Sequence, residues 1–216
     1  MMRAMRRHVA ALVALLAFGV GGAFAAEPAK GTFLVASRQV ADSNFFQTVV
    51  LLATYSEEGA MGLIVNRPTP LELAKMLPHI EGMAERTDLA HFGGPVEKNK
   101  MVLLIRGSQQ FEEAEAVLPD VQMSASGELL ERLIAEGAVF RAYAGYAGWG
   151  PGQLEAEIDR GDWTVVPATS AAVFSDEPES LWDLLIKKAE VRFARLPAPP
   201  AKSQARRGSF ASTPAE

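Results

Sequence analysis

Most of the chain alternates short apolar runs with polar turns, a pattern typical of a protein built mainly from strands. Val49–Tyr55 is apolar on both faces, which indicates a strand buried within a sheet. Other runs have the length and the flanking turn residues of strands. They are Thr32–Ala36, Met61–Val65, His91–Gly94, Lys100–Arg106, Val139–Tyr146 and Trp163–Val166.

Helices are predicted where apolar positions recur every three or four residues. Glu128–Glu136 places its apolar side chains on one face and stops at Gly137. A short helix is predicted over Gln153–Asp159. A longer one is predicted over Glu177–Val191, with Pro178 in its first turn, where proline is tolerated. The chain is therefore expected to contain both strands and helices.

A further helix is predicted to begin at Thr69. The side chain of Thr69 suits an N-cap, Pro70 suits the first helical position, and Glu72 completes a capping box. Pro78 marks the end of this helix, because proline cannot continue the backbone hydrogen bonds.

The segment Gly145–Ile158 reads G-Y-A-G-W-G-P-G-Q-L-E-A-E-I and is rich in glycine before it turns helical. Glycine loses more backbone entropy on folding than other residues, so ordering this segment is costly unless its backbone approaches something closely. A ligand is one possibility, because a helix N-terminus attracts anions. The other is a strand-to-helix corner in which Trp149 packs on the sheet. The glycine spacing fits neither of the phosphate-binding motifs G-x-x-x-x-G-K-[ST] and G-x-G-x-x-G. Pro151 also removes one backbone N–H donor from the turn.

Both ends of the chain differ in composition from the middle. Residues 1–25 combine a basic start, an apolar core and an Ala-Phe-Ala site, which predicts an export signal cleaved near Ala25 and a periplasmic protein. Residues 26–196 are expected to form one domain. Residues 197–216, rich in proline and basic side chains, are expected to be disordered.

The charge is acidic over the body and basic over the tail. The chain has 21 basic and 26 acidic residues, and removal of the three arginines of the export signal leaves a net charge of −8. Nucleic-acid affinity depends on neutralising phosphates, so an acidic body does not favour a nucleic-acid partner. The basic tail allows weak contact with an anionic membrane surface. The chain has no cysteine, which excludes disulfides.

Three segments together resemble the AlgH/YqgE family of bacterial proteins of uncharacterised function. They are G-A-M-G-L-I-V-N-R-P at 59–68, F-G-G-P-V at 92–96 and the glycine-rich segment at 145–158. The resemblance covers about residues 31–193. It implies one compact α/β (α+β) domain whose mixed, bifurcated sheet curls into a pseudo-barrel with helices outside. Some members are described as transcriptional regulators, but this chain begins with an export signal, unlike its generally cytoplasmic relatives.

The candidate binding residues lie at predicted strand ends. Asn66 and Arg67 follow an apolar run. The guanidinium fork of Arg67, beside Asn66, could bind an anion. Alternatively, the two residues form a structural turn in which Arg67 pairs with an acidic side chain. Gly93-Gly94 is a predicted turn. We expect these loops to gather at one end of the sheet. The predicted ligand-binding surface consists of Asn66, Arg67, Gly93, Gly94, Gly148, Trp149, Gly150 and Gln153.

Catalytic and metal sites are not indicated. His79 and His91 do not form a ligand cluster, and the hydrolase motifs G-x-S-x-G and H-E-x-x-H are absent. Glu155 and Glu157 are two apart on a predicted helix, so their side chains point away from each other and are not a catalytic pair. No catalytic residue, metal or cofactor is therefore predicted.

The leading hypothesis is a non-enzymatic, exported binding or regulatory domain that recognises an unknown protein or a small anionic ligand. The alternative is an enzyme of unrecognised type with a cleft near Arg67 and the 145–153 segment, using Glu155 or Asp162 as its acidic group. A transcriptional regulator is the third hypothesis. The sequence contains no helix-turn-helix or basic recognition helix that would favour it.

Overall fold

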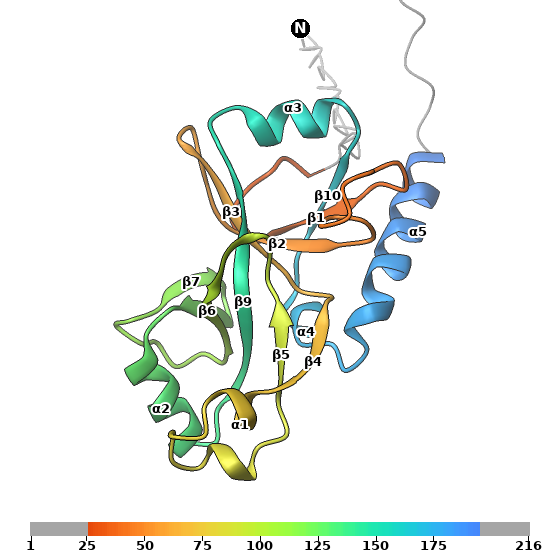
Figure 1. Ribbon diagram of the computed structural model, residues 1–216. Coiled ribbons are helices and arrows are strands. Elements are labelled where there is room, and N and C mark those ends of the chain that lie inside the picture. Colours follow the sequence, from red (N-terminus) through yellow and green to blue (C-terminus); the bar gives the residue numbers. More distant parts are fainter. Residues whose placement is uncertain (1–25, 195–216) are drawn as a thin grey trace, which may run out of the picture.

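The computed structural model describes residues 26–194 (Figure 1). The predicted export signal over 1–25 and the tail from 195 onward lie outside the described residues. Within residues 26–194, no helix has the length and apolar character needed to span a membrane.

The described chain folds as one α+β domain around a ten-stranded sheet. Its strands are β1 Thr32–Ala36, β2 Val49–Ser56, β3 Gly59–Ile64, β4 Pro68–Glu72, β5 Leu89–Phe92, β6 Val96–Arg106, β7 Glu115–Leu118, β8 Val121–Ser124, β9 Val139–Trp149 and β10 Trp163–Pro167. The main path runs β10-β1-β2-β3-β9-β6-β8-β7, with the β4–β5 pair attached to β9. Neighbours are antiparallel except β5 and β9, which run parallel.

The sheet forks at β9, the long strand at the centre of Figure 1. β6 pairs along most of β9, from Val139 to Tyr146. β5 pairs with β9 at Tyr143 and Ala144, and β3 pairs with its end, from Ala147 to Trp149. The mixed, bifurcated sheet implied by the family resemblance is therefore present.

The sheet is open, so the expected pseudo-barrel is not closed. β7 approaches the start of β1, where a Cβ on Gly31 would lie 2.8 Å from the carbonyl oxygen of Val117. Both edges of β1 are already occupied, by β10 and by β2. β7 therefore cannot pair with β1, and the two end strands of the path, β7 and β10, do not pair with each other, so the sheet remains open.

The helices pack around the forked sheet. They are α1 Leu73–Met76, α2 Gly127–Ala135, α3 Gln153–Asp159, α4 Ser170–Val173 and α5 Leu181–Ala194, with short 3-10 turns at Met83–Glu85 and Pro178–Ser180. α5 is anchored to β1 by the indole of Trp182, whose Nε1 donates to the carbonyl oxygen of Ala36 at 2.7 Å. The helices predicted at 128–136, 153–159 and 177–191 are present, the last with its first turn in 3-10 form.

Two apolar cores lie on opposite faces of β6. Leu103 and Ile105 belong to the core under α1 and α2, whereas Leu104 belongs to the larger core around β1–β3 and α5. Successive side chains of a strand point to opposite faces, so a central strand with both faces buried needs apolar residues at every position. This explains the unbroken apolar run Val102–Ile105.

The prediction of a helix that begins at Thr69 is wrong. Residues 68–72 form strand β4, and helix α1 covers only Leu73–Met76. The Thr69 hydroxyl donates to the carbonyl oxygen of Ala90 at 2.8 Å instead of capping a helix. Pro70 is tolerated because β4 is an edge strand, where a missing N–H breaks no ladder.

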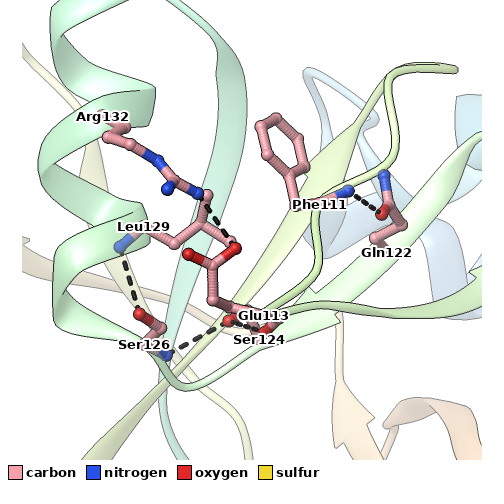
Figure 2. Close-up of polar contacts among 7 residues, drawn as sticks. All are labelled: Phe111, Glu113, Gln122, Ser124, Ser126, Leu129 and Arg132. Carbon is pink, nitrogen blue, oxygen red and sulfur yellow. Dashed lines mark hydrogen bonds and ion pairs between the residues drawn. The ribbon is translucent and has the colours of Figure 1, made fainter.

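The β7–β8 hairpin was not predicted, and buried polar groups on β8 hold the loop that precedes it (Figure 2). The Gln122 amide accepts from the backbone N–H of Phe111 at 3.1 Å and donates to the carbonyl oxygen of Gln109. The Ser124 hydroxyl donates to the carbonyl oxygen of Glu113 at 2.6 Å. The side chains of β8 thus replace water for a loop without its own secondary structure.

Candidate functional site

A cavity of about 640 Å³ opens where β5, β6 and β9 face the connection between α4 and α5. This volume is within the range of small-molecule sites. Its sheet side contributes His91, Arg106 and Arg141, and its other side contributes Phe174 and residues 176–180.

His91 reaches this cavity from β5 with only 7% of its surface exposed. Its Nδ1 lies 3.2 Å from the carbonyl oxygen of Leu89, and because a carbonyl only accepts, Nδ1 carries the proton. Burial, reinforced by the positive charge of Arg141, lowers the pKa of His91 to about 4. The ring is therefore neutral at pH 7, and Nε2 has a lone pair with no hydrogen-bond donor in the described part of the chain.

Two guanidinium groups lie beside Phe174 at the same cavity. The central carbons of Arg106 and Arg141 are each 5.8 Å from the centre of the Phe174 ring. Arg141 donates to the carbonyl oxygens of Val173 and Ser175, which fixes the end of α4 against β9. Arg106 is exposed at the end of β6, and its guanidinium forms no hydrogen bond or ion pair with another described residue. Arg106 is thus free to meet a ligand.

Tyr143 lies behind the cavity, in register with His91 across the parallel pair β5–β9. The two ring centres are 5.2 Å apart. The Tyr143 hydroxyl is buried and has no hydrogen-bond partner among the described residues. Burial raises the pKa of Tyr143, so its hydroxyl stays protonated and remains a donor.

Carboxylates occupy the rim. Asp88 is held by Arg86 at 2.6 Å, and Arg86 in turn lies over the ring of Phe140. The other carboxylates, on Asp176, Glu177 and Glu179, are exposed and form no ion pair with a described residue. The cavity is therefore positive on the sheet side and negative on the side of the connecting segment.

Asn66 and Arg67 make structural contacts with the loop before β2. The Asn66 amide accepts from the backbone N–H of Val49 at 2.8 Å and donates to the carbonyl oxygen of Gln47 at 2.9 Å. The Arg67 guanidinium donates to the carbonyl oxygens of Asn44 and Phe46, at 2.8 and 2.7 Å. Both residues line a smaller cavity of about 350 Å³, which shares Pro68 and Glu179 with the larger one.

The glycines of the candidate surface allow strands to cross closely at the fork. A Cβ on Gly93 would lie 2.2 Å from the carbonyl oxygen of Gly145, and one on Gly94 would lie 2.1 Å from the backbone of Tyr146. The Gly93 N–H donates to the carbonyl oxygen of Ala144 at 2.9 Å. Of the two explanations for the glycine-rich segment, the neighbouring strand accounts for Gly145.

The end of the glycine-rich segment holds a tryptophan pair. The indole N–H groups of Trp149 and Trp163 both donate to Oε2 of Glu157 at 2.8 Å. Gln153 donates to Oε1 of the same carboxylate at 3.0 Å and accepts from the N–H of Gly150 at 3.1 Å. Trp149 is nearly buried, as expected for a corner packed on the sheet. This cluster borders a third cavity of about 290 Å³, which Gly148 also lines.

The predicted surface is thus divided between separate places. Asn66 and Arg67 open to one cavity, and Gly148, Trp149 and Gln153 to another, with the loop before β2 between them. Gly93 and Gly94 are buried at the fork. The carboxylates of the alternative enzyme hypothesis do not line the cavity of about 350 Å³ to which Arg67 opens. Glu155 accepts from the Tyr55 hydroxyl at 2.6 Å, which lowers the pKa of Glu155, and Asp162 pairs with Arg160.

Arg106 and Arg141 were missed as site residues from the sequence. Each stands in a run that reads as an ordinary strand, and nothing nearby indicates a ligand. The pairing of β6 and β9 places Arg106 opposite Val139, two residues before Arg141. The one available signal was an arginine within an apolar strand or at its end. Whether such an arginine reaches a cavity depends on the strand order, which the sequence does not give.

The fold and the cavity define a single-domain α+β protein with a forked, open sheet. A comparison with protein families matches residues 33–194 to the AlgH-like family, DUF179. This chain belongs to the AlgH-like family.

Relatives and solved structures agree with that assignment. A UPF0301 protein of Myxococcus xanthus is 38% identical over 160 residues, which cover 71% of this chain and 87% of that protein. A UPF0301 protein of Chlorobium luteolum is 34% identical over 163 residues, covering 74% and 85%. The solution structure of the AlgH protein from Pseudomonas aeruginosa is similar with a TM-score of 0.62 and 32% identity, covering 76% of this chain and 88% of that one. A crystal structure of a protein from Corynebacterium diphtheriae is similar with a TM-score of 0.65 and 25% identity, with the same coverage.

Proposed function

We propose that this protein binds a small molecule carrying an acidic group, and that the cavity lined by His91, Arg106 and Arg141 is its binding site. The observation that carries the proposal is the convergence of two guanidinium groups and a neutral imidazole on one cavity of about 640 Å³. An arginine fork suits carboxylate and phosphate oxygens, and the His91 Nε2 lone pair accepts a hydrogen bond from a ligand hydroxyl or amide. The arrangement serves binding and contains no activated nucleophile.

Arg106 is the residue that tests this site. Its guanidinium has no hydrogen bond or ion pair to lose among the described residues, and the backbone pairing of β6 is unaffected, so Arg106→Gln is expected to fold normally. A charge-assisted hydrogen bond contributes about 1.5–3 kcal/mol, so this change is expected to weaken an acidic ligand by about tenfold or more. Arg160→Gln is the matched control, because Arg160 is also exposed and borders a different cavity.

The measurement is a heteronuclear NMR titration with inorganic phosphate and with adipate, a linear dicarboxylate. The amide signals of His91, Arg141 and Phe174 are expected to shift in the wild type and in Arg160→Gln, and to shift only at higher concentration in Arg106→Gln. If neither these probes nor ε-aminocaproate moves these signals, or if both variants bind equally, the proposed site is wrong.

We also propose that the protein is exported and binds its ligand outside the cytoplasm. The support is the pattern of residues 1–25, with its basic start, apolar core and Ala-Phe-Ala site. Cell fractionation with mass analysis of the N-terminus is expected to find a periplasmic chain that begins at Ala26. A full-length chain in the cytosol would contradict this location without affecting the cavity.

A further inference from the structure

We infer that the ligand of this cavity is a zwitterion, with an acidic group at one end and an ammonium group at the other. The inference rests on the binding function proposed above and adds the second charge. It is carried by the separation of charge between the two sides of the cavity.

The sheet side receives the acidic end. Arg106 and Arg141 supply positive charge there, and Arg141 cannot turn away because the carbonyl oxygens of Val173 and Ser175 hold it. Only 7% of the surface of His91 is exposed, and its Nε2 has no hydrogen-bond partner among the described residues. The Nε2 lone pair is therefore available to accept a hydrogen bond from a donor group of a ligand in the cavity.

The connecting segment receives the ammonium end. Asp176, Glu177 and Glu179 all line the cavity, and none pairs with a cation in the described part of the chain. Asp88 differs from them, because Arg86 already neutralises it. Three unpaired carboxylates facing two guanidinium groups leave the cavity with excess negative charge.

This excess disfavours a ligand that is purely anionic. A dianion that satisfies the arginines brings its second charge close to the carboxylates, where like charges repel through a partly desolvated space. A simple amine meets the carboxylates but leaves the arginines and His91 without a partner. A zwitterion whose ends point to the two sides satisfies both, as expected for a free amino acid or a related amino-acid metabolite.

The test compares three probes with the same carbon-chain length: adipate, ε-aminocaproate and hexylamine. Isothermal titration calorimetry at low salt, supported by the His91 and Arg141 amide signals, gives the relative affinities. The wild type is expected to prefer ε-aminocaproate over adipate by about fivefold or more, because one like-charge contact is replaced by an attraction. Added salt to about 0.15 M is expected to reduce this preference.

A double variant tests which side of the cavity binds the ammonium group of the ligand. Asp176→Asn with Glu177→Gln is expected to abolish or reverse the preference, so that adipate binds at least as well as ε-aminocaproate. The control is Glu57→Gln with Glu58→Gln, which changes the net charge equally at the exposed β2–β3 turn and is expected to keep the preference. Both pairs are exposed, so neither change removes a buried contact.

The outcomes separate this inference from the proposed function. Stronger binding of adipate than of ε-aminocaproate to the wild type would overturn the zwitterion and leave the acidic-ligand site in place. Preference retained in the Asp176→Asn, Glu177→Gln variant would also overturn it. Binding of hexylamine alone, or of none of the probes, would overturn both.

Discussion

At the scale of single residues, His91 links the candidate site to the stability of the fold. Its pKa falls from its ordinary value of 6.5 to about 4, first because burial disfavours the imidazolium and then because Arg141 is close. Between about pH 6.5 and pH 4, the unfolded chain therefore binds a proton that the folded chain does not. The free energy of unfolding falls as the pH is lowered through this window.

We expect His91 to cost about 1–2 kcal/mol of stability at pH 5 relative to pH 7.5, from the size of its pKa shift. Urea unfolding of the wild type and of His91→Gln at the two pH values measures this difference. The carboxylates at the cavity, Asp88, Asp176, Glu177 and Glu179, are unchanged in both proteins and cancel in the comparison. His79→Gln is the control, since His79 is exposed and should keep the wild-type pH dependence. Equal pH dependence in all three proteins would contradict a buried neutral His91.

Glu157 shows how far a single residue can be interpreted from its neighbours in sequence. Helical spacing correctly separated it from Glu155 and placed both outside the buried stripe of α3. The contact of its carboxylate with the indoles of Trp149 and Trp163 depends on where β9 and β10 deliver those rings. Hydrogen bonds between residues on different elements leave no mark in local periodicity.

At the scale of elements, β8 stabilises a loop that has no regular structure. Gln122→Leu removes the bond to the N–H of Phe111 (Figure 2) and also the bond to the carbonyl oxygen of Gln109, and it leaves both loop groups without their partner. We expect a loss of about 2–3 kcal/mol, as for a buried polar contact broken on one side. Urea unfolding measures the loss, and amide hydrogen exchange should show faster exchange at Phe111.

The control for this element is Gln110→Ala. Gln110 is exposed, and its amide donates only to the nearby carbonyl oxygen of Ser108. Its removal is expected to change stability by about 0.5 kcal/mol or less. Equal effects of the two changes would mean that β8 does not hold the loop.

The elements also show where local signals failed. The capping signs at Thr69, Pro70 and Glu72 were all present, yet these residues form an edge strand beside β5. Capping contributes only about 1 kcal/mol, so the tertiary pairing of β4 with β5 overrides this local preference. The strongly periodic α2 and the doubly apolar β2 were predicted correctly, because their patterns agree with the tertiary packing.

At the scale of the whole molecule, the fork requires glycine where β5 leads into β6 across β9. Gly93→Ala would place a Cβ 2.2 Å from the carbonyl oxygen of Gly145 and 3.0 Å from Tyr143 Cβ. We expect a loss of more than about 4 kcal/mol or no folded protein, because backbone atoms of β9 cannot move aside. Thermal unfolding followed by circular dichroism measures the effect.

Gly127→Ala is the matched control for this prediction. A Cβ on Gly127 meets no atom within 4 Å, and the residue is the first of helix α2. Alanine there is expected to be neutral or to stabilise by up to about 1 kcal/mol, mainly by restricting the unfolded chain. A Gly93→Ala protein that unfolds at the same temperature as the wild type would contradict the close approach of Gly93 to β9 at the fork.

The sequence by itself determined the family, most strands and the main helices, because these follow from local periodicity and from motifs that lie in one stretch of chain. It also indicated that the glycine-rich segment has a backbone in close contact with something. Only the tertiary structure decided that this contact is another strand, and that His91, Arg106 and Arg141 meet at one cavity. The physical reason is that these three side chains come from three strands, β5, β6 and β9. Their proximity depends on strand order, which is set by the packing of the two cores and not by any local pattern.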